Sequence, residues 1–302
     1  MSRAIARARR AGAGPAAGRP LAGSPVRRVA GPVLGLLLGW SAAPLGAHEY
    51  WLDPVDATPD ANGILFAHVR NGEEFAGTSF PYDPRRMERL LLVGPGGTAP
   101  IAARLGDIPA VQASLGRAGH YLVVLDTYGK ELVYDDLAGF EAFLVYHGLE
   151  RHLDEHVARD LPDVGIREIY FRHVKTLARA GDTEPDAAAL SEGVSAAQGQ
   201  ALELVPENDP YVDGRIDVVL LADGEPLADA QVELFERTPD GAVSRTVASS
   251  DGEGRASFDV ARAGDYLLNA VQVHEPGPEA LVLEGPTPHW ESRWASLTFE
   301  RR

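Results

Sequence analysis

Short apolar segments recur along most of the chain, and residues that favour turns separate them. The segment 64–69 runs into Arg70-Asn71-Gly72, and the segment 87–93 ends at a glycine-rich turn. Segments this short, with alternating polarity, suit half-buried strands rather than helices. Because they follow one another closely, they favour a sandwich or a barrel, and the sequence predicts a mainly β protein.

One helix is expected to interrupt this series. Apolar residues between 137 and 149 recur at spacings of three and four, which places them on one helical face. We expect this helix near residues 136–158. The segment 169–178 fits either a strand or a helix, and its alternation favours the strand.

A boundary between two domains is predicted at 206–210, where two prolines and three polar residues disfavour a regular element. Beyond it, about six or seven short strands in about 90 residues follow the immunoglobulin-like pattern. The GEPLADAQV run followed by DGEG also resembles small transthyretin-like modules. We expect two β-sandwich-like domains, 48–205 with one short helix, and 206–302, immunoglobulin-like or transthyretin-like.

The first 47 residues follow the order of a secretory signal peptide. Residues 1–28 carry seven arginines and no acidic residue, a short apolar stretch follows, and small residues precede His48. The apolar stretch is shorter than the roughly 20 residues that a membrane-spanning helix needs. We predict cleavage after Ala47 and a periplasmic or otherwise exported mature chain that begins at His48. An uncleaved membrane anchor is the alternative.

Charge and cysteine content exclude several classes of function. The leader contains seven of the 28 basic residues and none of the 44 acidic ones, so its removal leaves a formal charge of −23. Such a chain repels nucleic acid and anionic lipid, and we expect no nucleic-acid partner and no stable membrane insertion. The chain has no cysteine, which excludes disulfides, thiolate metal sites and cysteine nucleophiles.

Histidine and carboxylate residues near both ends of the mature chain are candidate metal ligands. If His48 is the first residue, its α-amine and imidazole can chelate one cation, and Glu49 can add an oxygen. Further along the chain, His274 and the neighbouring pair His289 and Glu291 offer nitrogen and oxygen donors. The alternatives are a solvent-exposed His48 and ordinary surface histidines.

Two enzymatic alternatives remain open. The segment His152-Leu153-Asp154-Glu155-His156 matches the H-x-x-E-H pattern of inverted zinc proteases, although its charged surroundings favour a solvated helix end. A copper histidine brace at the mature terminus is the other. The mature chain has no phosphate-binding glycine loop and no G-x-S-x-G elbow. We therefore expect that the protein is not an enzyme.

Eight segments of the mature chain carry a resemblance to a known family: AHEYWLDP, NGEEFAG, FEAFLVYHGL, YFRHVKTLARAG, LELVPENDPY, GEPLADAQVELF, DGEGRASFDVARAGDYLLNAVQV and WESRWASLTFE. Together they are similar to the domain of unknown function 4198 family, which has been linked to periplasmic components of nickel and cobalt uptake systems. His48 matches the family's post-leader histidine, and Trp290-Glu291-Ser292 matches its late W-E-S motif. The family often has a histidine two residues before His274, where this chain has Gln272.

The resemblance implies a periplasmic accessory protein that captures nickel or cobalt, before copper or zinc, for a membrane importer. The expected ligands are His48, Glu49, His274, His289 and Glu291. Neutral imidazole and amine donors bind such a cation near neutral pH, and protonation below about pH 6 should release it. A metal-free interaction module of the cell envelope is the alternative function.

Overall fold

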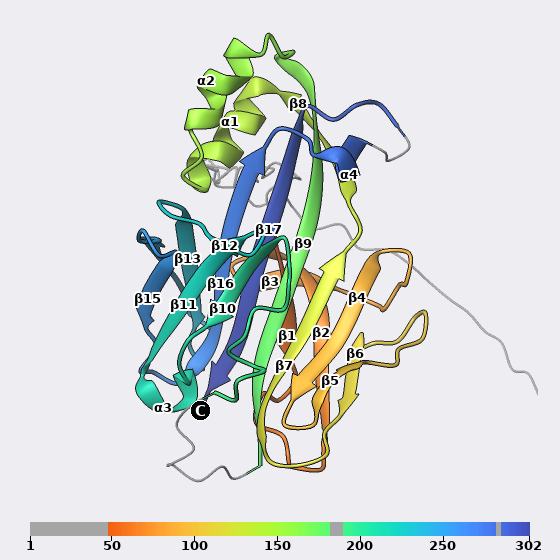
Figure 1. Ribbon diagram of the computed structural model, residues 1–302, viewed down its shortest axis with the longest axis vertical. Coiled ribbons are helices and arrows are strands. Elements are labelled where there is room, and N and C mark those ends of the chain that lie inside the picture. The colour runs from red at the N-terminus through yellow and green to blue at the C-terminus, as the bar shows by residue number, and fades with distance from the viewer. Residues whose placement is uncertain (1–47, 182–189, 282–284) are drawn as a thin grey trace, which may run out of the picture. The chain divides into compact units, whose positions relative to one another are not determined.

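The computed structural model describes residues 48–181, 190–281 and 285–302, and the predicted leader 1–47 lies outside them. The described residues belong to one compact unit. They form a mainly β protein with several sheets and few helices (Figure 1), which confirms the fold class at this level.

A nine-stranded sheet contains strands from both sides of the predicted domain boundary. Its order is β14-β13-β16-β17-β9-β7-β4-β5, and β8 also pairs with β9. These strands are β4 (Met87–Gly94), β5 (Gly97–Pro100), β7 (Gly119–Thr127), β8 (Lys130–Asp136), β9 (Val164–Ala180), β13 (Gln231–Arg237), β14 (Val243–Ser249), β16 (Gly264–His274) and β17 (Trp290–Arg301). Segment 169–178 lies within β9, so the strand interpretation is confirmed.

Two four-stranded sheets accompany the large one. The first, sheet A, contains β1 (Glu49–Pro54), β2 (Ile64–Glu73), β3 (Ala76–Phe80) and β6 (Val111–Ser114). The second, sheet C, contains β10 (Leu202–Pro206), β11 (Arg215–Ala222), β12 (Glu225–Pro226) and β15 (Arg255–Asp259).

Strand β7 shows that the small sheets cover opposite faces of the large sheet. Leu122 and Val124 pack in a core cluster with sheet C, whereas Val123 and Leu125 pack in a cluster with sheet A. Successive side chains of a strand point to opposite faces, so the two clusters lie on the two sides of the sheet. This double burial explains why the middle of β7, residues 121–125, is apolar without interruption.

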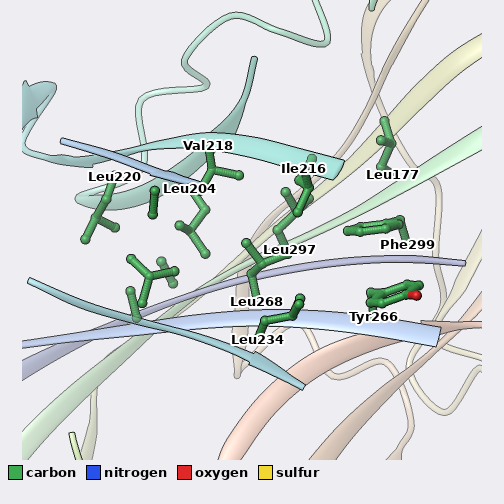
Figure 2. Close-up of a cluster of buried hydrophobic side chains, with 14 of the residues drawn as sticks. Leu177, Leu204, Ile216, Val218, Leu220, Leu234, Tyr266, Leu268, Leu297 and Phe299 are labelled. Carbon is green, nitrogen blue, oxygen red and sulfur yellow. The ribbon is translucent and has the colours of Figure 1, made fainter. Parts of the chain in front are cut away.

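The core beneath sheet C is built from interdigitating aliphatic side chains (Figure 2). Leu204, Ile216 and Leu220 from β10 and β11 face Leu234, Leu268 and Leu297 from β13, β16 and β17. Burying one such side chain contributes about 1.5–3 kcal/mol, so this layer is a major part of the stability.

The large sheet also crosses the predicted domain boundary at 205/206. Strand β17 pairs in parallel with β9, from Trp290 beside Glu168 to Thr298 beside Thr176. The prolines of segment 206–210 instead mark the end of β10 and the start of the short helix α3 (Pro210–Asp213). The two sandwich-like layers therefore share one sheet.

The predicted helix near 136–158 is two helices, which corrects the expectation of one. They are α1 (Leu137–Tyr146) and α2 (Arg151–Ala158), and they lie together at one end of the long strands (Figure 1). Between them Gly148 has a φ of 68°, a left-handed conformation that ends α1. The last helix is α4 (Pro278–Leu281). Within the described residues, no helix has the length and apolarity that a membrane crossing requires.

A buried ion pair connects the large sheet to sheet C. The Lys175 ammonium on β9 donates to Glu203 Oε1 at 2.5 Å and to the Leu204 carbonyl at 3.0 Å. Both charged side chains are almost fully buried. The other contacts of Glu203 are backbone N–H groups of residues 198–200, which donate to its two oxygens. Burial lowers the pKa of Lys175, and the nearby Glu203 carboxylate opposes that effect.

Removing one member of this pair should cost more than removing both. We expect Lys175→Met to lower the free energy of unfolding by about 3–5 kcal/mol, because it leaves the Glu203 charge buried and unpaired. The double variant Lys175→Met, Glu203→Gln should recover part of that loss, since a neutral amide replaces the charge. Urea unfolding of the three proteins measures the difference, and equal losses in both variants would contradict this account.

Candidate functional site

The first two predicted ligands, His48 and Glu49, point to different surroundings. His48 Nδ1 lies 3.0 Å from Glu73 Oε1, in a partly exposed position. Glu49 is 1% exposed, and the backbone N–H of Glu74 donates to its Oε2 at 3.2 Å. Burial, with Glu233 as the second cause, raises the pKa of Glu49 to about 8. At neutral pH Glu49 is therefore mostly a neutral interior acid, which is a weak metal ligand.

His289 has an arginine beside its ring. The backbone N–H of Arg167 donates to Nδ1 at 3.0 Å, and the Arg167 guanidinium lies 3.2 Å from Nε2. Burial lowers the pKa of His289, and the positive charge of Arg167 adds to this effect. Both ring nitrogens therefore face donors of Arg167, which leaves no free lone pair directed at a cation.

His274 and Glu291 are brought together by the sheet. They are register neighbours on β16 and β17, and His274 Nε2 lies 3.3 Å from Glu291 Oε1. The carbonyl of Glu275 lies 2.7 Å from Nδ1, so Nδ1 carries the proton that is donated to it. In the neutral ring the Nε2 lone pair therefore faces a carboxylate oxygen. A cation between the two atoms would accept a lone pair from each.

The rest of the Glu291 carboxylate is held in place. Its Oε2 accepts from the backbone N–H of Gly277 at 2.9 Å, and its Oε1 accepts from Arg293 Nε at 3.1 Å. Arg293 is shared with Asp223, which accepts from its Nη1 through both oxygens at 2.8 Å. These contacts fix the direction of the oxygen that faces His274.

Two of the five predicted ligands are thus adjacent, and the other three have separate partners. Among the residues that the structure describes, no group of three or more His, Cys, Asp or Glu side chains is arranged to hold a metal ion. A cation at His274 and Glu291 would have two protein ligands, and water or a partner would supply the rest.

The H-x-x-E-H segment lies on α2, where His152 and His156 both face the interior. Trp290 Nε1 donates to His156 Nδ1 at 3.1 Å, and His156 Nε2 lies 3.2 Å from the Pro162 carbonyl. His152 Nδ1 bonds to Glu155 at 2.8 Å. Because both nitrogens of His156 are engaged, this segment does not form the two-histidine face that zinc proteases use.

The sequence reasoning missed the buried acid Glu233 on β13. It is 1% exposed, it accepts from Arg245 and from Asn269 Nδ2, and it lies 3.4 Å from His147 Nδ1. The one signal was an acidic residue inside the apolar strand segment 230–235. The charge of Glu233 contributes to the raised pKa of Glu49.

Glu49 should make the stability depend on pH. A carboxyl whose pKa is about 8 in the folded chain, against 4.5 ordinarily, stabilises the fold while it is protonated. That contribution is complete below pH 4.5 and is lost as the pH rises through about 8. Between about pH 5 and pH 9 the wild type should lose about 2 kcal/mol or more of unfolding free energy that Glu49→Gln retains.

Urea unfolding across this pH range measures the effect, and Glu74→Gln is the matched control because Glu74 is an exposed neighbour. The control should follow the wild-type profile. If Glu49→Gln follows it too, Glu49 does not titrate in this range.

Comparisons with solved structures give only distant likenesses. The D0-D1 domain of Intimin has 10% identity and a TM-score of 0.19, over 83% of this chain and 97% of that one. A tetra-tandem repeat in the extending region of a large adhesion protein has 12% identity and a TM-score of 0.19, over 84% of this chain and 50% of that one. A two fibronectin type-III domain segment from chicken tenascin has 13% identity and a TM-score of 0.18, over 84% and 99%.

The search of curated proteins found no match. The comparison with family models did find one, over residues 45–274, for the family described as Domain of unknown function (DUF4198). Because this match covers most of the chain, the protein belongs to the DUF4198 family.

Proposed function

We propose that this protein is a non-enzymatic periplasmic accessory protein that captures nickel or cobalt for a membrane importer. The observation that carries the proposal is the pair His274 and Glu291, whose Nε2 and Oε1 atoms lie 3.3 Å apart. Export through the leader 1–47 and an immunoglobulin-like or transthyretin-like character of residues 206–302 are parts of the same proposal.

The geometry of the pair suits a transition-metal cation. Two ligand atoms at about 2.0–2.2 Å from one metal and at adjacent coordination positions lie about 3 Å apart, which is close to the observed separation. The Glu275 carbonyl also holds the Nδ1 proton of His274, as an outer partner of a metal-bound histidine commonly does. The imidazole therefore presents its free lone pair toward Glu291 without rearrangement.

The surroundings favour weak and reversible binding. Arg293 donates to the same oxygen of Glu291 that faces His274, and its positive charge opposes a bound cation. A site with two protein ligands also leaves coordination positions free. Both features suit a protein that transfers its metal to another one, because the acceptor can add ligands before the first ones leave.

A predicted second donor set is the mature terminus. If cleavage exposes His48, its α-amine and imidazole can chelate a cation independently of His274. Intact mass of protein purified from a bacterial periplasm tests this part, and a mass that begins elsewhere would exclude the chelate.

Metal titration of the exported protein tests the main proposal. We expect nickel or cobalt to bind the EDTA-treated protein, and His274→Ala and Glu291→Gln each to weaken binding by about tenfold or more. His289→Ala is the matched control, because groups of Arg167 lie against both ring nitrogens of His289. This variant should leave the affinity unchanged. Calorimetry with nickel, cobalt, copper and zinc separately identifies the preferred ion.

Absence of binding by the wild type would overturn the metal proposal in favour of a metal-free interaction module. Copper-selective binding that His48→Ala abolishes and His274→Ala does not would instead indicate the histidine brace.

A further inference from the structure

A cavity of about 390 Å³ lies on the face of the large sheet that sheet A covers. Its walls come from β1, β2, β3, β4, β7, β8 and β9, together with the segment that precedes β4. Tyr170 and Arg172 of β9 line it, and so do Arg86 and Lys130. A volume of this size is within the range of small-molecule sites.

Arg172 is a buried cation that lacks an anionic partner. Its side chain is 6% exposed, and Nε and Nη1 have no hydrogen-bond partner within the described part of the chain. The guanidinium carbon lies 3.9 Å from the ring centroid of Trp294 and 5.0 Å from that of Tyr170. Aromatic stacking therefore fixes the plane of the guanidinium while leaving its donors unused.

Among the described residues, no carboxylate forms an ion pair with Arg172. The hydroxyl groups of Tyr134 and Ser292 donate to Glu168, and burial raises its pKa. Burial lowers the pKa of Arg172 to about 10, so the guanidinium remains charged at neutral pH.

A buried charge without a partner costs several kcal/mol. The chain bears this cost at Arg172 although a methionine or leucine would fill the space. Arg172 lines the cavity, so an anion that enters it supplies the missing charge. The arrangement is thus incomplete without a ligand from outside the described residues.

The other charged groups of the cavity have the same sign as Arg172. Lys130 and Arg86 are exposed cations on the wall, and Asp83 is the one carboxylate that lines it. Asp83 is already bound by Arg85, which donates to its two oxygens at 2.9 Å and 2.8 Å. The whole chain has a formal charge of −16, so this local excess of positive charge is not the general character of its surface.

The remaining walls are aromatic and apolar. Tyr50, Tyr128 and Tyr170 contribute rings, and Phe80 and Met87 contribute apolar surface. Arginine binds carboxylates through two parallel hydrogen bonds, and the apolar walls suit a hydrocarbon or aromatic body. Inorganic phosphate would match the charges but would leave these walls against water.

We propose that this cavity binds a small organic carboxylate, with Arg172 holding the carboxylate group and the aromatic walls holding the body of the molecule. This site is separate from His274 and Glu291, and the proposal does not depend on metal binding.

Calorimetry on the EDTA-treated mature protein tests the proposal, with phenylacetate as the probe. We expect phenylacetate to bind with a Kd of about 1 mM or tighter, and Arg172→Met to weaken it at least about tenfold. Lys130→Gln should weaken it by about threefold, because this exposed cation contributes charge without a fixed contact. Arg262→Gln is the matched control outside the cavity and should bind as the wild type does.

Two further measurements separate a binding role of Arg172 from a structural one. The thermal stability of Arg172→Met without ligand should equal or exceed that of the wild type, because an unpaired buried charge has been removed. Phenylacetamide, the neutral analogue, should not bind measurably. A lower stability of Arg172→Met with unchanged phenylacetate affinity would assign the arginine to packing alone and overturn the proposal.

Three other outcomes would also overturn it: no phenylacetate binding by the wild type, equal binding of phenylacetamide, or binding of inorganic phosphate as tight as that of phenylacetate. Lys130 is exposed, so Lys130→Gln keeps the test available if Arg172→Met does not fold. Because the calorimetry uses EDTA-treated protein without metal, a failure to bind phenylacetate does not bear on the nickel and cobalt proposal. A failure to bind metal likewise does not bear on the carboxylate proposal.

Discussion

The parallel pairing of β9 with β17 is the interaction on which the rest of this structure depends. It joins strands more than 100 residues apart in the sequence. The chain between them includes all the strands of sheet C. It makes one sheet serve two cores, with sheet A on one face and sheet C on the other. It also places Arg172, which lines the cavity, beside Trp294. Ser296 and Thr298 of β17 then donate to carbonyls of β1, which attaches the first strand to the last.

Local sequence patterns predicted most of the strands but not their pairing. The alternation in 169–178 and the short segments after residue 210 correspond to strands. They could be predicted because the burial of one or both faces of a strand determines the polarity of neighbouring residues. The local sequence does not determine which other strand a strand pairs with. The prolines at 206–210 mark a real interruption between β10 and α3, and after it the chain adds further strands to the sheet that contains β9. The single helix was likewise divided by a left-handed glycine, Gly148, which a helical pattern tolerates.

The candidate sites show the same limit. His274 and Glu291 could be named from their chemistry, and the β16–β17 register makes them neighbours. His289 could be named for the same reason, but Arg167, which is far away in the sequence, lies against both of its ring nitrogens. Arg172 was not singled out, because a charged residue in an alternating strand is normally on the solvent side. Its burial becomes visible only when sheet A covers that face.

Four buried charged or ionisable groups lie on β9, and the comparison between them carries the argument for a ligand. His173 Nδ1 lies 2.9 Å from the Asp126 carboxylate, so this group has a partner. Lys175 has Glu203 within hydrogen-bond distance, so the chain itself compensates the charge. Glu168 accepts from two hydroxyl groups, one at each oxygen, and burial raises its pKa. Arg172 can use neither solution, since a guanidinium stays protonated at physiological pH and no carboxylate of the described residues pairs with it. Stacking on Trp294 and Tyr170 orients it but does not supply negative charge. A strand that compensates its other buried groups and leaves this one open to a cavity is organised for an anion that arrives from solution.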